Sequence, residues 1–520
     1  MSAAHHHWNH HVLRRFPNRI VIWVLCVFVC GVVYINIRFM KSLSTVMPSM
    51  NRKPDEFESV LSLPQDVQIE DRVISVPPIV LHQPMKECSP KLLPLLEKVA
   101  INNNVIISVF DYSFLSQFFS FYHNSIIPLG ITNFIAFALD KRSYSVLDKW
   151  GIPCILLELD TADSTISTSD YDTSAFVNKV NMKTMAVIHV LRSGYNVLLT
   201  DVDVVFFKNP FDFFTCLGCD IHIQREDRSS RSHERNSGFI YVRNTPRSRS
   251  LFDLAWENYQ NNRNLRQQPA LNNAIDVMLR EKLRMQLLPL NKFAPGWVFF
   301  ENLHYNSLDS LPCDDCVMFH NNWIVSSNAK EYRLKELGLY HSMDSYYSNS
   351  TAKYITYESL SPDSSIGQEE KVLASALLTA IALNRILILP EFKCHRDNEI
   401  EIQNEELFNH PQNVCTMNTY WCIRQFDEAF ALYYREHSFL INPQVPESIR
   451  NEFEAAPIIY PDVERKILNP TLVRQLFAEY ESYRLIKLNS IPFTVRDAEW
   501  AGRLLSAFKR SGYRQYECKH

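Results

Sequence analysis

The chain has 520 residues, with 46% hydrophobic, 12% aromatic and 21% charged side chains and a formal net charge of −4. This length leaves room for two or three domains, and the composition is that of a folded globular protein, which excludes a small disulfide-stapled module and a disordered chain. The charge balance gives no bias toward nucleic acid, and we find no basic face interleaved with aromatic residues. Nucleic acid is therefore not an expected partner.

The N-terminal part carries one long apolar stretch, Ile20 to Ile37, in which Asn36 is the only clearly polar side chain. As a helix this stretch spans roughly 27 Å, close to the hydrocarbon thickness of an ER or Golgi bilayer. A cleaved signal peptide is the alternative, but it needs a shorter apolar core and a small-residue cleavage site, and this stretch instead runs into Arg38. Basic residues flank both ends, so charge leaves the orientation open. We expect a cytosolic tail at 1–19, a signal anchor at 20–37 and the remainder in the lumen.

Ten of the twelve cysteines lie beyond the expected anchor. Cys216 with Cys219, and Cys313 with Cys316, have the CxxC spacing of zinc sites, but an oxidising lumen favours disulfides. About 100 residues separate the two pairs, without the spacing of a zinc ribbon, and this also favours disulfides. Asn349 begins an Asn-Ser-Thr sequon and is the expected glycosylation site, which agrees with lumenal exposure.

Prolines crowd the stretch after the anchor, which predicts a semi-extended stem at 38–100. Sustained hydrophobic patterning follows, and it predicts a first globular α/β domain at 101–345. A polar stretch at 342–368 marks a second boundary, and beyond it we expect a smaller α/β domain at 353–520.

Apolar runs alternate with polar or helical segments in both globular parts. The first part opens with expected strands at 105–110, 133–139 and 154–159, and the second with a helix at 369–383 and a strand at 385–390. Runs of this length between helical segments are typical of a parallel sheet with crossover helices.

The most informative unit is a helix at Met182–Arg192, which Gly194 is expected to end in a left-handed conformation. An apolar strand, Tyr195–Thr200, then leads directly into Asp201 and Asp203. Because open α/β sheets bind ligands at the carboxyl ends of their strands, this pair is a candidate site.

Two aspartates one residue apart can hold a hard divalent cation, which prefers carboxylate oxygen ligands. Such a cation neutralises the charge that appears when a sugar leaves a nucleotide diphosphate. One carboxylate would bind the metal and the other the ribose or the metal's waters. The spacing alone occurs in many surface turns, but the apolar strand before it and the apolar segment Val204–Phe211 after it place this pair inside a folded sheet.

Aspartate-nucleophile phosphatases have a similar strand-DxDxV pattern, in which the first aspartate, here Asp201, would attack phosphorus. Asp314 and Asp315 could imitate the further acidic pair that such enzymes need. That fold carries its DxD on the first strand of the sheet, whereas at least three strand-helix units precede it here. The pattern therefore favours the metal site over the phosphatase.

Four segments in order resemble the nucleotide-diphospho-sugar transferase family, glycosyltransferase family 77: KTMAVIHVLRSGYNVLLTDVDVVFFKNPF, RNSGFIYVRNT, QQPALNNAI and MFHNNWIVSSNAKEYRL. The later segments LASALLTAIALNRILILPEFKC and REHSFLINPQVP resemble the tail of plant extensin-type arabinosyltransferases. The resemblance implies a GT-A fold and a Golgi type II membrane enzyme. It implies Mn²⁺- or Mg²⁺-dependent transfer of arabinose, xylose or galactose from a UDP-sugar to a glycan or glycoprotein, with retention of configuration.

The resemblance also assigns roles to single residues. Asp201 and Asp203 are expected to be catalytic and to hold the metal, and Asp201 to contact the nucleotide. His320 is expected as the third metal ligand through a neutral imidazole, with a core histidine as the alternative. Lys183 is expected to meet the diphosphate, although a solvated helix lysine is equally consistent. Lys330 is expected to neutralise the leaving diphosphate as a point charge.

Amide side chains and a glycine complete the expected site. Asn236 and Gly238, with Ser237 between them, are expected just before a strand, where a glycine permits close approach of the nucleotide-sugar, and an ordinary turn is the alternative. The sugar-binding segment of the family corresponds to Gln268, Asn272 and Asn273. The family usually has an aspartate where this chain has Gln267, so the segment departs from the pattern there.

A catalytically silent, membrane-anchored sugar-binding or scaffold protein with the same fold is the main alternative to an enzyme. Intact Asp201, Asp203 and His320 argue against it, because nothing structural requires an exposed acidic pair at a strand end.

Overall fold

A computed structural model describes residues 89–157, 173–226, 234–302, 315–324, 326–393, 415, 417–463 and 466–508. They all belong to one compact unit, and the tail and anchor expected at 1–37 lie outside them. Across these described ranges, no helix combines the length and the apolar character that a bilayer span needs. The expected domain limits at 345 and 353 stay a prediction.

The first helix lies within the segment expected as stem. α2 (Leu92–Val99) buries Leu92 and Leu96 completely in the core of the first sheet. Pro94 falls in the first turn, where a proline costs no intrahelical hydrogen bond. The folded part therefore starts ahead of residue 101.

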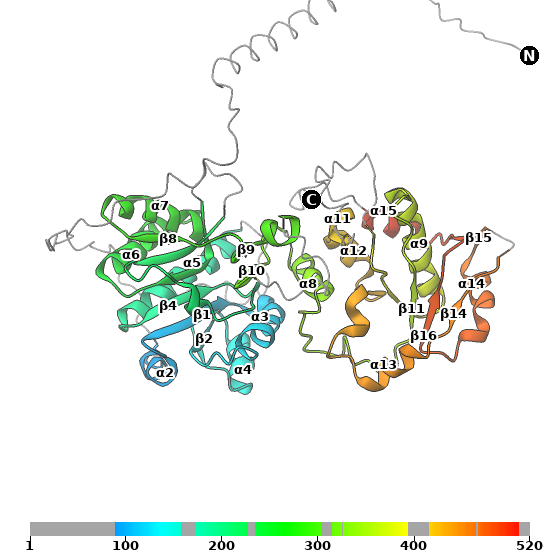
Figure 1. Cartoon of the computed structure of the whole chain (residues 1–520), viewed down its shortest axis with the longest axis horizontal. Coiled ribbons are helices and arrows are strands. Elements are labelled where there is room, and N and C mark those ends of the chain that lie inside the picture. The colour runs from blue at the N-terminus through cyan, green and yellow to red at the C-terminus, as the bar shows by residue number, and fades with distance from the viewer. Residues whose placement is uncertain are drawn as a thin grey trace, which may run out of the picture. The chain divides into compact units, whose positions relative to one another are not determined.

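A seven-stranded sheet forms the first α/β part, with the strand order β3-β2-β1-β4-β7-β6-β8 (Figure 1). Neighbouring strands pair in parallel except where β7 meets β4 and β6. The predicted α/β class with a mixed, mostly parallel sheet is confirmed. The strands are β1 (Asn104–Phe110), β2 (Phe134–Ala138), β3 (Cys154–Leu156), β4 (Asn196–Thr200), β6 (Ile221–Arg225), β7 (Arg235–Val242) and β8 (Met285–Leu287).

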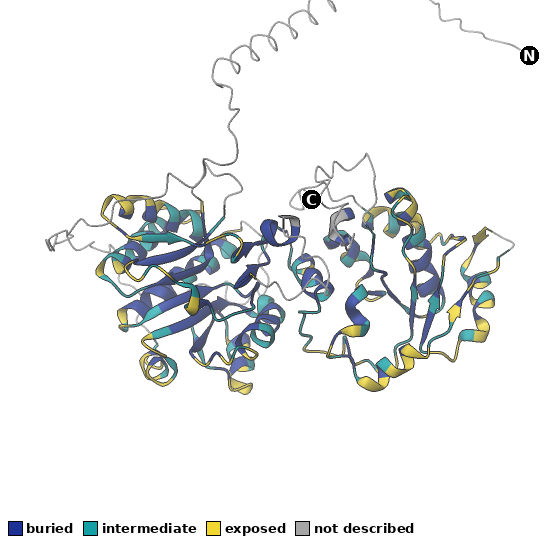
Figure 2. Cartoon of the chain, in the orientation of Figure 1, coloured by how far each residue is buried: buried dark blue, intermediate teal, exposed yellow. Residues whose placement is uncertain are grey.

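Helices cover both faces of this sheet, because alternate side chains of each strand point to opposite sides. Val105 and Ile107 pack into a core with α2 and three further helices, whereas Ile106 packs on the other face. The strands are almost entirely buried, except the edge strands β3 and β8, which are largely half-buried (Figure 2). The first face carries α5 (Ser174–Arg192), α6 (Pro246–Asn261) and α7 (Gln267–Arg280), and the second carries α3 (Leu115–Phe121) and α4 (Lys141–Lys149).

The predicted end of the helix before the aspartates is confirmed. α5 ends at Arg192, and Gly194 has a φ of +97°, a left-handed conformation that a glycine adopts without steric cost. β4 follows at once, as the apolar run predicts.

A second, three-stranded sheet lies beside the end of β4. It consists of β5 (Val204–Phe206), β10 (Met318–His320) and β9 (Phe293–Pro295), in the order β5-β10-β9. β5 and β10 are antiparallel, and His320 is the register partner of Val204. This pairing brings His320 next to Asp203, although more than a hundred residues separate them in sequence.

The C-terminal part forms a five-stranded, all-parallel sheet with the order β13-β12-β11-β16-β14. The predicted helix and strand are present as α9 (Ile366–Ala382) and β12 (Ile386–Ile388). β11 (Tyr354–Tyr357) lies inside the polar stretch expected as a boundary and is the central strand of the sheet. The remaining strands are β13 (Tyr434–Arg435), β14 (Ile458–Ile459) and β16 (Leu485–Leu488), with α12 (Ile423–Phe430) and α13 (Glu447–Glu454) among the helices.

The described cysteines other than Cys154, which is free, agree with the disulfide interpretation. Cys216 and Cys219 form a disulfide, and Cys316 is also disulfide-bonded. Cys313 lies outside the described residues. For the first CxxC pair the prediction of a disulfide instead of a zinc site is confirmed.

One helix takes part in two hydrophobic cores. α8 (Ser327–Glu336) places Ala329 and Tyr332 in the core of the C-terminal sheet. On its other side Leu334 packs into the core beneath the three-stranded sheet. Asn328 Nδ2 donates a hydrogen bond to Asp427 Oδ2 of α12 at 2.7 Å. α8 thus joins the first α/β part to the C-terminal part.

Glu336, at the end of α8, is buried where the two parts meet. Its Oε1 accepts a hydrogen bond from the backbone N–H of Met417 at 3.2 Å. Burial raises the pKa of Glu336 from 4.5 to about 8, because the charged form is poorly solvated there. The folded protein therefore holds a proton on Glu336 at neutral pH that the unfolded chain has released.

We predict that Glu336→Gln becomes more stable than the wild type as pH rises. A raised carboxyl pKa makes the folded wild type lose stability between about pH 4.5 and pH 8, and glutamine does not titrate. The difference in unfolding free energy should grow by at most about 1.4 kcal/mol per pH unit. Denaturant unfolding at pH 5 and pH 8 measures it, with the exposed Glu428→Gln as control. A difference independent of pH would contradict the burial of a neutral Glu336.

Candidate metal centre

The turn that carries the two aspartates is held by strands on either side. The backbone N–H of Asp201 donates to the carbonyl of Gly238 in β7 at 2.7 Å. The carbonyl of Asp203 accepts from the backbone N–H of Asn321, just after β10, at 2.7 Å. Both aspartates thus follow the carboxyl end of a central strand, as predicted, in a turn with a fixed backbone.

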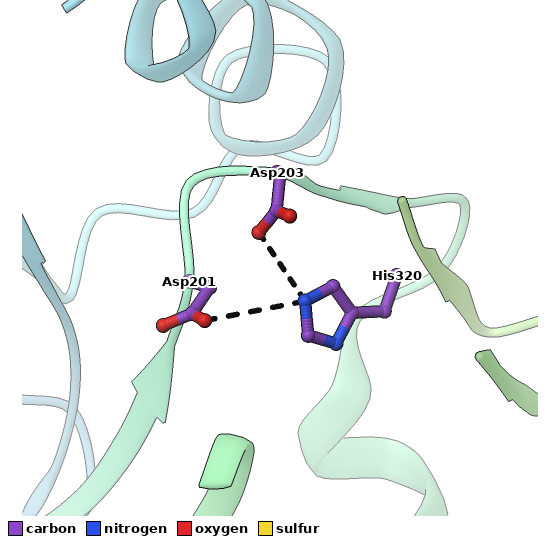
Figure 3. A group of neighbouring side chains, drawn as sticks. All are labelled: Asp201, Asp203 and His320. Carbon is purple, nitrogen blue, oxygen red and sulfur yellow. Dashed lines mark ion pairs between the residues drawn. The ribbon is translucent and has the colours of Figure 1, made fainter. Parts of the chain in front are cut away.

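Asp201, Asp203 and His320 form one cluster, in which one ligand atom from each lies within 4.8 Å of the others. Figure 3 shows one imidazole nitrogen facing both carboxylates. His320 Nε2 is 3.2 Å from Asp203 Oδ1 and 4.0 Å from Asp201 Oδ2. The side chains of Asp203 and His320 are 7% and 4% exposed, and that of Asp201 is 21% exposed, so the cluster opens on the Asp201 side. Two carboxylates and an imidazole suit a divalent cation.

Gln224 sets the tautomer of His320. The Nε2 group of Gln224 donates to the carbonyl of Phe293 at 3.1 Å, so its Oε1 faces His320 Nδ1 at 3.0 Å. An acceptor opposite Nδ1 requires that nitrogen to carry the hydrogen. A neutral imidazole with this hydrogen carries its lone pair on Nε2, the nitrogen that faces the aspartates, which is the arrangement that metal-binding histidines need.

A lysine is paired with each aspartate. Lys183 Nζ lies 2.5 Å from Asp201 Oδ1, and Lys330 Nζ lies 2.6 Å from Asp203 Oδ2. Lys183 is therefore ion-paired in the cluster, and the alternative of a solvated helix lysine is wrong. Burial alone would raise the pKa of Asp203, but Lys330 and His320 outweigh it and hold that pKa well below its usual range.

Gly238 lies against the cluster and leaves no room for a side chain. A β-carbon there would lie 2.6 Å from Asp201 Oδ2 and 2.7 Å from His320 Cε1. Asn236 and Gly238 belong to β7 itself, so the expectation that they precede a strand is wrong. These residue types are typical of a turn, yet Asn236 pairs with Gln224 of the neighbouring strand β6.

Two of the three predicted sugar-binding amides contact the start of β7. Gln268 Oε1 accepts from the backbone N–H of Ser237 at 3.2 Å, and Asn272 Nδ2 donates to the carbonyl of Arg235 at 2.9 Å. Asn273 is exposed on α7, and no described contact joins it to the cluster. Gln267 is buried at the first position of α7. The predicted sugar-binding role of these amides stays a prediction.

Several polar residues near the site were missed from the sequence. Lys179 Nζ, one helical turn before Lys183 on α5, pairs with Asp111 Oδ2 at 2.7 Å beyond the end of β1. Gln224 and Glu226 lie at the end of β6. Two patterns in the sequence could have indicated these residues. The two lysines are four residues apart, which puts them on one face of a helix, and polar residues alternate with Ile221 and Ile223, which puts them on one face of a strand.

Residues 129–334 match the family described as nucleotide-diphospho-sugar transferase. This segment contains the whole cluster and both lysines. The resemblance seen in the sequence is therefore confirmed for this part of the chain.

Curated relatives carry names of the same class. The chain is 24% identical over 270 residues to beta-arabinofuranosyltransferase RAY1 of Arabidopsis thaliana, covering 48% of this chain and 49% of that protein. It is 22% identical over 470 residues to arabinosyltransferase XEG113 of the same plant, covering 75% of this chain and 70% of the relative. UDP-D-xylose:L-fucose alpha-1,3-D-xylosyltransferase 3, also from Arabidopsis thaliana, is 26% identical over 48% of this chain and 70% of its own length. The chain thus spans about half the length of the first of these relatives.

We predict that Gly238→Ala lowers the affinity for a divalent cation by about tenfold or more, because the new methyl group displaces Asp201 and His320. Calorimetric titration with Mn²⁺ measures this. Gly367→Ala, whose new methyl group would meet its nearest atom at 3.9 Å, serves as the control. Equal affinity in the two variants would show that Gly238 does not fix the cluster.

Proposed function

We propose that this chain is a metal-dependent glycosyltransferase that moves a sugar from a UDP-sugar to a glycan or glycoprotein acceptor. The observation that carries the proposal is the cluster of Asp201, Asp203 and His320 beyond β4, inside the segment that matches the transferase family. The names of the relatives support arabinose or xylose as the sugar, and a further relative, UDP-galactose:fucoside alpha-3-galactosyltransferase of Dictyostelium discoideum, supports galactose.

Asp203, His320 and Asp201 would hold Mn²⁺ or Mg²⁺, which would supply charge stabilisation for the departing diphosphate. The residues of the chain prepare this step. Gln224 holds the hydrogen of His320 on Nδ1, which makes Nε2 the ligand atom of the neutral imidazole, and the partial exposure of Asp201 leaves one side of the cluster open. Lys183 and Lys330 now neutralise the two carboxylates, and both are 18–23% exposed. They can release their partners once another cation takes over, and then offer point charges to the diphosphate.

Retention of configuration remains part of the proposal. A front-face departure, in which the leaving phosphate accepts the proton of the acceptor, requires no nucleophile from the protein. This agrees with a cluster in which both aspartates are assigned to the metal.

A silent sugar-binding protein would not need a histidine held in the ligating tautomer, so the contact from Gln224 favours the enzyme. The phosphatase alternative requires its aspartates after the first strand, whereas β4 is the fourth strand in chain order. Asp315 is exposed and no described contact joins it to the cluster, and Asp314 lies outside the described residues.

For localisation we propose a Golgi enzyme with single-pass type II topology and a lumenal catalytic part. The apolar stretch at 20–37 supports it, as does the disulfide between Cys216 and Cys219, which suits an oxidising compartment. Asn349 is only partly buried. Its Oδ1 accepts hydrogen bonds from Thr351, the third residue of the sequon, in a local turn.

We predict that Asp203→Asn lowers UDP-sugar turnover on the order of 100-fold or more, because the lost carboxylate stabilises charge mainly as the diphosphate departs. EDTA should abolish wild-type activity, and added Mn²⁺ or Mg²⁺ should restore it. Thermal unfolding is recorded alongside, because the change leaves Lys330 without its partner. Full UDP-sugar activity in Asp203→Asn, or hydrolysis of a generic phosphate ester lost only in Asp201→Asn, would reject the proposed site.

We predict that protein made in microsomes carries an endoglycosidase-sensitive glycan that Asn349→Gln removes. Its C-terminal half should resist protease added from the cytosolic side, since the bilayer shields a lumenal domain. Cleavage of that half in intact vesicles would contradict the orientation.

A further inference from the structure

One carboxyl group near the cluster has no part in the proposed chemistry. Glu226 follows β6 directly, and its backbone N–H donates to the carbonyl of Glu234 at 3.1 Å, which continues the pairing of β6 with β7. It lies two residues after Gln224, so both side chains leave the same face of the strand. Gln224 already contacts His320.

A single oxygen of Glu226 receives two side-chain amides. Its Oε2 accepts from Asn236 Nδ2 at 2.5 Å and from Asn322 Nδ2 at 3.1 Å. The carbonyl ends of these asparagines are also engaged. Asn236 Oδ1 accepts from the backbone N–H of Gly238 at 2.6 Å, and Asn322 Oδ1 from that of Gly296 at 2.7 Å.

Both asparagines lie beside residues that shape the cluster. Asn322 is two residues after His320, and Asn236 is two residues before Gly238, whose backbone lies against Asp201 and His320. Glu226 therefore links the segment that carries His320 to β7, the strand that carries Gly238. These two segments are not direct neighbours in either sheet, since β7 and β10 belong to different sheets.

We propose that Glu226 is a positioning residue that holds His320 and Gly238 in place around the metal site by accepting both asparagine amides. The inference rests on the proposed function for the identity of that site. Loss of the acceptor leaves two amide donors without a partner in a largely buried place, and each is free to turn toward another acceptor.

The chemistry of Glu226 suggests the substitution that tests this. Burial raises the pKa of Glu226 to about 7, although the hydrogen bonds from both asparagines oppose the shift. A neutral side chain is thus tolerated at this place. Glutamine keeps the shape and a carbonyl acceptor for both amides, whereas leucine keeps the approximate size and removes the acceptor.

The experiment measures Mn²⁺ affinity of the full chain by calorimetry, in the presence of UDP, for Glu226→Gln, Glu226→Leu and the exposed neighbour Glu234→Leu. We expect Glu226→Gln to stay within about threefold of the wild type, Glu226→Leu to lose about 10- to 100-fold, and Glu234→Leu to match the wild type. Asn322→Ala removes the same link from the other side. The loss of Mn²⁺ affinity in Asn322→Ala should not add to the loss in Glu226→Leu when both changes are combined. If Glu226→Leu does not fold, the affinity of Asn322→Ala alone tests the proposal.

Distinct outcomes separate this inference from the proposed function. A wild type that binds no Mn²⁺ overturns the proposed function itself. Wild-type Mn²⁺ affinity in Glu226→Leu and Asn322→Ala, or an equal loss in Glu226→Gln and Glu226→Leu, overturns the positioning role. Normal Mn²⁺ binding in Glu226→Gln with turnover lowered several hundredfold would make Glu226 a catalytic residue instead.

Discussion

The antiparallel pairing of β5 with β10 is the contact on which the site depends. β5 begins one residue after Asp203 and β10 ends at His320, and the register sets His320 opposite Val204. Each strand contributes only three paired residues. This short pairing brings the two aspartates and His320 together from two segments that are far apart in the sequence. Loop closure over such a separation is entropically costly, and the buried apolar side chains of both strands offset that cost.

Charge compensation is the second constraint. Like-charged carboxylates in a buried site repel one another, and the chain balances them by giving each a lysine from a different helix. Lys183 comes from α5, which covers the sheet, and Lys330 comes from α8, which follows the second sheet. Two aspartates and two lysines make the cluster close to neutral when no cation is bound, and a divalent cation would make it positive, which suits a diphosphate.

Local features of the sequence predicted the first half of this arrangement. The apolar strand, the glycine after α5 and the aspartates lie within ten residues, so periodicity and turn chemistry suffice. The second half depends on tertiary contacts. Strands of three residues, such as β5 and β10, are too short to show a hydrophobic periodicity. Asn236 and Gly238 predict a turn because these residue types are rare in buried strands. Gln224 and Glu226 were missed for the same reason, since nothing in the sequence distinguishes a polar face that meets solvent from one that meets a site.

The packing of α8 limits where the chain can be divided. The segment that matches the transferase family ends at residue 334, inside this helix, whereas the packing does not end there. Ala329 and Tyr332 are part of the interior of the C-terminal sheet, so a transferase segment cut out at its family limit would present these side chains to water. Exchange of the segment between proteins as a unit would therefore require a new partner surface for one helix. A shortened chain that keeps Lys330 beside Asp203 must therefore also keep the C-terminal part that covers this helix.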